Sequence, residues 1–318
     1  MPAKIAVLLL VLASASPLAA ADRGASSIVG KQIAAYGGDW VTVPQAVNSR
    51  GQIAGFAIRE ENEWVAFIRS RGGRYEAIAD RGFVYDMNEK GDVVGVLFVD
   101  DFGALEGFIW NRRRGLQTLG SFLPFSVNAR SDMAGVCEPP GGLREACVMR
   151  DGVVSVIPDG SEARAINRAG TVVGVYGDNR AFLLTNSSEF IDIGRGVAED
   201  INDHGVVAGN RFRQVPNRGE RAVVTAFTSR GDRSPGDVGL SVAINERGWV
   251  ISTAFRLGDD GVEHPYAFAW NSATGKRVAL ASTLGEFILP EAISDKGLIV
   301  GTSEGVPMVW TLKNKKKH

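Results

Sequence analysis

The stretch that decides the fold is Ala165-Ile166-Asn167-Arg168-Ala169-Gly170-Thr171-Val172-Val173-Gly174, because versions of it recur along the chain. We take the residue in the place of Asn167 as the anchor of each copy. The seven anchors are Asn48, Asn88, Asn128, Asn167, Asn202, Asn245 and Ser294. By subtraction, they are spaced by 40, 40, 39, 35, 43 and 49 residues. Repeats of this period are typical of solenoids, propellers and arrays.

The anchor and the residue three positions later predict a tight turn. Asn at the first position of a type I turn can bond its own backbone, and Gly at the fourth supplies the left-handed conformation that closes a bulged hairpin. Ser131 departs from this pattern, so strain or a different turn is expected in the third copy. The residues three positions after the anchors are Gly51, Gly91, Ser131, Gly170, Gly205, Gly248 and Gly297.

The same turn predicts the register of each hairpin. The residues one before and five after the anchor, such as Ile166 and Val172, are apolar in every copy and should face each other. The next residue, Val173 here, points to the opposite face and is apolar too. A sheet that is apolar on both faces must be sandwiched between neighbours. Gly174, one residue further, indicates a bulge or a close approach of backbone.

Each repeat offers four short strands, and the third is marked by Ala-Phe or an equivalent, as in Ala181-Phe182. The fourth is weak in the fifth repeat, near Gly236 to Gly239. Four strands in about 40 residues is the period of a propeller blade. We therefore predict an all-β fold: a seven-bladed β-propeller of four-stranded antiparallel blades. The last repeat stops after its third strand, so an N-terminal strand within residues 28–36 is expected to close the last blade.

The two ends of the chain predict its processing and location. Residues 1–21 combine Lys4, an apolar run from Ile5 to Leu12 and small residues before Asp22, as in a secretory signal peptide. An uncleaved anchor is the alternative, although the run is too short to span a bilayer. Residues 22–312 then form one β-propeller domain, and 313–318 form a basic disordered tail. A secreted or periplasmic protein without a membrane span is expected.

Composition narrows the classes of partner. The chain is 45% hydrophobic and 22% charged, with a formal net charge of −1. This balance gives no reason to expect binding to nucleic acid or to an anionic membrane. No spacing typical of a Ser-His-Asp triad or a zinc site is present, so neither a cofactor nor a metal is predicted. The expected partner is an extracellular glycan, peptide or protein.

The pattern Ala-Ile-Asn-x-x-Gly-x-Val-Val-Gly, followed by an Ala-Phe strand, resembles the bacterial extracellular HAF-repeat family. The resemblance covers nearly all of the chain after residue 21. It implies secretion and a β-propeller-like fold, but no established general activity. The His of the family's His-Ala-Phe is absent, which leaves any role of that His in doubt. The matching positions hold Val65, Arg180, Thr225 and Tyr266.

The two cysteines, Cys137 and Cys147, fall in the second and third strands of the third repeat. Pairing them would close a short hairpin in an oxidising compartment. We predict this disulfide, and two buried thiols are the alternative.

The connections between second and third strands should emerge on one face of the ring, where they form a carboxylate-rich rim with one basic sector. Variable loops on a rigid scaffold are common binding sites. A solvated loop face without a ligand is the alternative. The candidate rim residues are Glu60, Asp100, Asp101, Asp178, Arg213, Asp259 and Asp260.

These observations favour a secreted or periplasmic repeat protein that acts as a non-enzymatic binding or interaction module. The repeats explain most apolar residues and leave no catalytic set. The alternative is a propeller enzyme, a hydrolase or lyase that acts on glycans or peptides through paired rim carboxylates. A purely structural envelope protein is a third possibility. The sequence therefore leaves enzymatic activity open and favours its absence.

Overall fold

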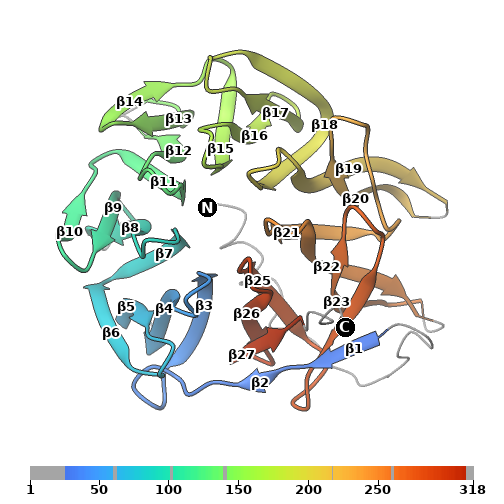
Figure 1. The fold of residues 1–318 in the computed structure, drawn as a ribbon, viewed down its shortest axis with the longest axis horizontal. Coiled ribbons are helices and arrows are strands. Elements are labelled where there is room, and N and C mark those ends of the chain that lie inside the picture. The colour runs from blue at the N-terminus through green and yellow to red at the C-terminus, as the bar shows by residue number, and fades with distance from the viewer. Residues whose placement is uncertain are drawn as a thin grey trace, which may run out of the picture.

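The computed structural model describes residues 26–59, 63–100, 103–138, 142–216, 218–258 and 261–312, and strands arranged around a central axis make up its regular structure (Figure 1). The strands of the first three repeats are β3 (Val41–Val47), β4 (Ile53–Arg59), β5 (Glu63–Arg69), β6 (Tyr75–Asp80), β7 (Gly82–Met87), β8 (Val93–Phe98), β9 (Leu105–Asn111), β10 (Gly115–Thr118), β11 (Phe122–Val127), β12 (Met133–Cys137), β13 (Glu145–Arg150) and β14 (Val153–Val156). The later ones are β15 (Gly160–Ile166), β16 (Val172–Tyr176), β17 (Arg180–Leu184), β18 (Phe190–Ile201), β19 (Val207–Val215), β20 (Gly219–Phe227), β21 (Gly239–Ile244), β22 (Trp249–Leu257), β23 (Glu263–Asn271), β24 (Arg277–Ala281), β25 (Ile288–Ile293), β26 (Leu298–Ser303) and β27 (Val306–Thr311). Two short strands, β1 (Ser26–Val29) and β2 (Lys31–Gln32), precede them.

The turn and register predictions are confirmed. In the fourth repeat the Gly170 N–H donates to the Asn167 carbonyl over 3.0 Å, and Ile166 faces Val172 across the hairpin. Ser131 has a φ of 69°, so it adopts the left-handed conformation that Gly supplies in the other copies. Every first strand carries a bulge near its middle, as between Ala163 and Ala165.

The prediction of seven separate four-stranded blades is wrong, because the described strands form six hydrogen-bonded sheets and the protein is a six-bladed β-propeller. The fourth and fifth repeats share one six-stranded sheet, β15-β16-β17-β18-β19-β20. Residues 190–195 of β18 pair with β17, and residues 196–201 pair with β19. Asn167 and Asn202 are only 35 residues apart, the shortest spacing in the chain. The outer strand of one repeat therefore runs on into the inner strand of the next without a turn.

The N-terminal segment completes the sheet of the last repeat, as predicted, through the two residues of β2, but it also adds β1 to the sheet before it. β1 lies parallel to β24, in the sheet of the sixth repeat. Two residues of β2 then pair antiparallel with β27, in the sheet of the seventh. The segment is thus divided between two neighbouring sheets, and it runs along the outside of the ring in Figure 1.

The core consists of layers between adjacent sheets, which explains why the hairpins are apolar on both faces. Ala54 and Ile68 of the first repeat pack with Val84, Phe108 and Trp110 of the second in one buried cluster. Burial of apolar area at about 25 cal/mol per Å² makes such layers the main source of stability. Within the described residues, no helix is long and apolar enough to cross a membrane.

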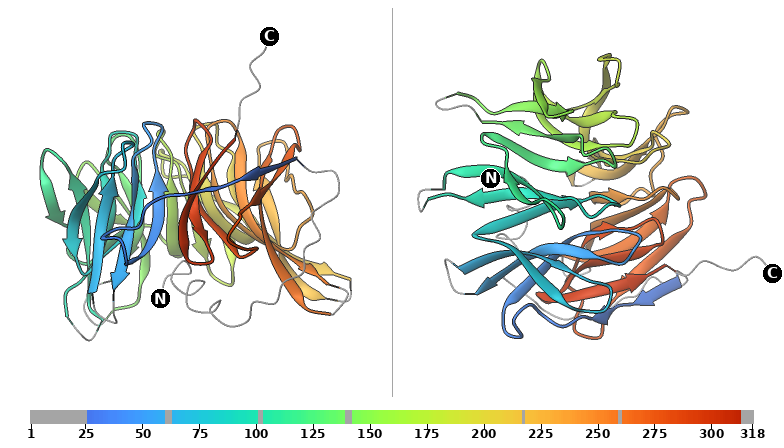
Figure 2. Two further views of the ribbon diagram at one scale, coloured as in Figure 1. Left: turned by 90° about the horizontal axis from the view of Figure 1, so that it is seen from below. Right: turned by 60° about the vertical axis from the view of Figure 1, so that its left-hand side comes forward.

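The order of the strands defines two faces of the ring. Consecutive strands of a sheet are antiparallel, so the turns after first and third strands emerge on one face and the connections after second strands on the other. We call these the turn face and the loop face. Figure 2 shows the ring edge-on, with connections projecting from both faces. The predicted rim belongs to the loop face.

Candidate functional site

The structure places the described rim residues apart, in different repeats. Asp100 follows β8, where its carboxylate accepts the Ala104 N–H over 2.8 Å. Asp178 is exposed between β16 and β17, and Arg213 is exposed on β19 opposite Arg221. Glu60, Asp101, Asp259 and Asp260 lie outside the described residues, as do residues 1–21 and 313–318. The rim as a binding site stays a prediction.

Several other carboxylates of the loop face have arginine partners. Glu138 pairs with Arg144 at 3.0 Å and Glu263 with Arg218 at 2.5 Å. The predicted disulfide is confirmed: Cys137 and Cys147 are bonded, with their Cα atoms 5.7 Å apart on the paired strands β12 and β13. Among the described residues, no group of three or more His, Cys, Asp and Glu side chains is placed to hold a metal ion.

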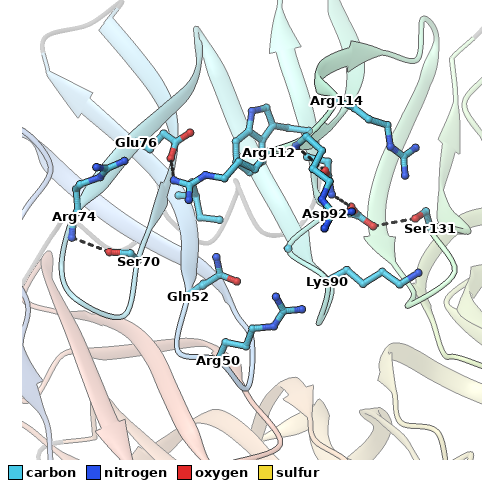
Figure 3. A pocket seen from close by; sticks show the side chains of 15 residues that line it. Arg50, Gln52, Ser70, Arg74, Glu76, Lys90, Asp92, Arg112, Arg114 and Ser131 are labelled. Atoms are coloured by element: carbon cyan, nitrogen blue, oxygen red, sulfur yellow. Dashed lines mark hydrogen bonds and ion pairs between the residues drawn. The ribbon is translucent and has the colours of Figure 1, made fainter.

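A pocket of ≈ 750 Å³ opens on the turn face between the sheets β3–β6 and β7–β10. Its walls come from the turns after β3, β5, β7 and β9, together with Ser131 after β11. In Figure 3, Arg50 and Lys90 lie along one edge and Arg112 and Arg114 along the other. Sequence reasoning missed this site because it looked for function in the longest loops.

The lining is strongly basic. It includes two carboxylates, Glu76 and Asp92, against six cationic side chains, although the whole chain has a formal net charge of −1. The cations are Arg50, Arg74, Lys90, Arg112, Arg113 and Arg114. Concentrating like charges in a concave site strengthens the local potential toward anions.

Asp92 lines the pocket and is 2% exposed. Its carboxylate accepts hydrogen bonds from Asn88 at 2.8 Å, from Ser131 at 2.9 Å and from the amide of Asn111. Burial acts to raise the pKa of Asp92, but these three hydrogen bonds, aided by the charge of Arg114, outweigh it and lower the pKa. Asp92 is therefore ionised, and its charge is directed to neighbouring protein donors.

Asn111 connects Asp92 to the arginine-bearing turn. Its amide donates to Asp92, while its Oδ1 accepts the Arg113 N–H over 2.9 Å and its carbonyl accepts the Arg114 N–H over 3.1 Å. The turn after β9 is thus held by its first residue. Arg112, the next residue, makes an ion pair with Glu76 across the pocket.

Comparison with known proteins supports the fold. No protein-family model and no curated protein sequence matches the chain. The β-propeller domain of the Trilobed protease from Pyrococcus furiosus is similar in structure, with a TM-score of 0.60 and 10% identity over 87% of this chain and 97% of that one. An oligogalacturonate lyase from Vibrio parahaemolyticus is similar with a TM-score of 0.51 and 9% identity, over 92% of this chain and 98% of that one. An uncharacterized protein from Listeria monocytogenes has a TM-score of 0.54 and 10% identity, over 92% of this chain and 100% of that one.

These likenesses define the chain as a β-propeller and go no further, because identities near 10% do not carry function across a fold. They include propeller domains attached to proteases, a lyase and a protein without an assigned role. The resemblance to the HAF-repeat family is supported only as far as the propeller fold.

Proposed function

We propose that this protein is an extracytoplasmic, non-enzymatic binding module that takes its ligand in the turn-face pocket between β3–β6 and β7–β10. The observation that carries the proposal is the pocket itself, which is large and rimmed by side chains of six residues of one charge. Pockets of this size are within the usual range for ligand sites. The Cys137–Cys147 disulfide supports an oxidising compartment.

The chemistry of the pocket favours binding over catalysis. Of its two carboxylates, Asp92 is surrounded by three protein donors and Glu76 is paired with Arg112. A general acid or base must reach the reacting proton within hydrogen-bond distance, and neither group is poised to do so. The arginines and the lysine serve as charged hydrogen-bond donors.

The test begins with purified, disulfide-intact protein screened on glycan and peptide arrays, followed by product analysis of every hit. We expect the ligand to be recovered unchanged. Amide hydrogen exchange with and without ligand should then show protection at the turns 48–52, 88–92 and 111–115. Turnover that is abolished by Asp178→Asn would contradict the proposal in favour of a rim-carboxylate enzyme. Protection confined to the loop face would contradict the choice of pocket.

A further inference from the structure

We infer that the ligand of this pocket is an acidic oligosaccharide, with carboxylate or sulfate groups spaced along a hydroxyl-bearing chain. This inference rests on the proposed function, since it names the ligand class of the same site. It follows from three observations: which cationic side chains of the pocket lack a described ion-pair partner, which hydrogen bonds hold them in place, and which neutral side chains lie between them.

Five of the six cations have no carboxylate partner among the described residues, and for four of these five no described main-chain oxygen accepts from the side chain either. Arg112 is paired with Glu76, and Arg50 donates to the main-chain oxygen of Glu89. No described carboxylate lies within ion-pair distance of the exposed side chains of the other four. These are Arg74, Lys90, Arg113 and Arg114. A cluster of uncommitted like charges is mutually repulsive, so an anionic ligand would stabilise it.

The repeat itself does not require this cluster. The corresponding turn is Arg150-Asp151-Gly152-Val153 in the third repeat, Thr185-Asn186-Ser187-Ser188-Glu189 in the fourth and Ser272-Ala273-Thr274-Gly275-Lys276 in the sixth. Each holds at most one arginine, whereas the second repeat has three in succession at 112–114. All these turns close equivalent hairpins, so the run of arginines is not needed for folding. It is better explained by what the pocket binds.

Hydrogen bonds within the protein also hold the turn that carries the three arginines. Asp92 fixes Asn111, and Asn111 fixes the main chain of Arg113 and Arg114. Ser131 contributes its hydroxyl to Asp92 from the neighbouring repeat at 2.9 Å. Ordering a charged turn in advance lowers the entropy lost on binding. Asp92 is thus a positioning residue, and it belongs to the support of the site rather than to its contact surface.

The charges are distributed rather than convergent. They come from four turns of two adjacent sheets, and neutral side chains, among them Gln52, Ser70 and Trp110, also line the pocket. The Gln52 side-chain oxygen Oε1 accepts from the Asn48 side-chain amide at 2.9 Å, which leaves the side-chain N–H groups of Gln52 to donate. A single phosphate would need converging donors. Spaced anions joined by rings with hydroxyl groups suit spaced cations separated by polar and aromatic surface.

The experiment is calorimetric titration of the intact protein with a linear hexuronate tetrasaccharide, its neutral methyl ester and a sulfated tetrasaccharide. We expect the uronate or the sulfated sugar to bind at least about tenfold tighter than the ester, and the affinity to fall as NaCl rises. The better of the two identifies the acidic group. Polyphosphate and poly-glutamate serve as competing polyanions, and either one binding tighter than both sugars would overturn the assignment to a saccharide.

The matched variant is Lys90→Gln/Arg113→Gln/Arg114→Gln, whose residues are exposed and outside the core. It should weaken binding about tenfold or more, while Arg230→Gln, an exposed arginine of a turn in the fifth repeat, should change it less than twofold. Equal binding of the ester, or an unaffected triple variant, overturns this inference but leaves a neutral-ligand binding module standing. Failure of every array ligand to protect the pocket turns overturns the proposed function itself.

Discussion

The side-chain amide of Asn88 donates a 2.9 Å hydrogen bond to the main-chain carbonyl of Asn128, the anchor of the next repeat. The link then recurs from repeat to repeat around the ring. It joins Asn128 to Asn167 at 3.0 Å, Asn167 to Asn202 at 3.2 Å, Asn202 to Asn245 at 3.1 Å and Asn245 to Ser294 at 3.0 Å. The anchors from Asn88 to Asn245 therefore close their own turns and also fasten their hairpins to the next repeat.

Replacing Asn128 by Ala should destabilise the protein by about 1–3 kcal/mol, because several buried groups lose a partner at once. The Asn128 Oδ1 accepts the main-chain N–H groups of Arg130 and Asp132, and the side-chain amide donates to the Asn167 carbonyl. Urea unfolding measures the change. Asn186→Ala, at an exposed turn position, is the control and should stay within about 0.5 kcal/mol. Equal effects of the two substitutions would show that the link contributes nothing.

Ser131 combines a strained backbone with a useful hydroxyl. Its φ of 69° favours Gly, but its Oγ donates to Asp92 over 2.9 Å. Ser188 has a similar φ of 67° and no hydrogen bond from its hydroxyl to a described residue. Ser131→Gly should therefore leave the protein about 1.5–3 kcal/mol less stable than Ser188→Gly, the value of a hydrogen bond to a charged group. Thermal and urea unfolding of both variants give the comparison; an equal response would remove Ser131 from the support of the pocket.

Gly174 shows why a small residue follows the two apolar residues Val172 and Val173 in the second strand of the repeat. A Cβ at this position would lie 1.9 Å from the Glu162 carbonyl oxygen and 2.9 Å from the Phe182 ring. Gly174→Ala should destabilise by about 1–3 kcal/mol through overpacking. In the sixth repeat Ser252 already carries a Cβ at this place, and its buried hydroxyl has no hydrogen-bond partner among the described residues. Ser252→Ala is thus the control and should be neutral or stabilising in the same unfolding assay.

The hairpins were predictable because their signal is local. The pairing of Ile166 with Val172 follows from turn chemistry and a period of two, and both lie within one ten-residue stretch. The number of sheets was not predictable in this way, because it depends on whether the chain turns between the outer strand of one repeat and the inner strand of the next. The spacing of 35 between Asn167 and Asn202 and the weak fourth strand near Gly236 were the available signals.

The sequence shows the basic residues of the pocket but not that they line one cavity. Arg112-Arg113-Arg114 and the basic turn residues Arg50 and Lys90 are plain in the sequence. That they line one pocket depends on how two neighbouring sheets present their turns, which no single repeat specifies. The rim residues attracted attention because their loops are long, yet length says nothing of whether loops from different repeats face one another.

Glu246 should make the protein less stable as the pH rises. It accepts the Asp203 N–H at 3.0 and 3.1 Å, and its own N–H donates to Asp295 at 3.0 Å. Burial, together with the charges of Asp203 and Asp295, raises the pKa of Glu246 above its ordinary 4.5, against the opposing effect of the Asp203 N–H. A raised pKa in the folded state means that folding favours the protonated acid. Its contribution to stability is present below pH 4.5 and is lost as the pH rises through the folded-state pKa.

Glu246→Gln keeps an oxygen for the Asp203 N–H and removes the charge. The variant should therefore be more stable than the parent at pH 7, and its advantage should shrink toward pH 4. Urea unfolding at intervals between these values measures it. Glu89→Gln is the control, because Glu89 accepts the Ser49 N–H over 2.8 Å at the same turn position, beside the basic Arg50. A gain for Glu246→Gln that is constant with pH, or as large for Glu89→Gln, would show that burial of the Glu246 charge and its repulsion by Asp203 and Asp295 are not the source of the gain.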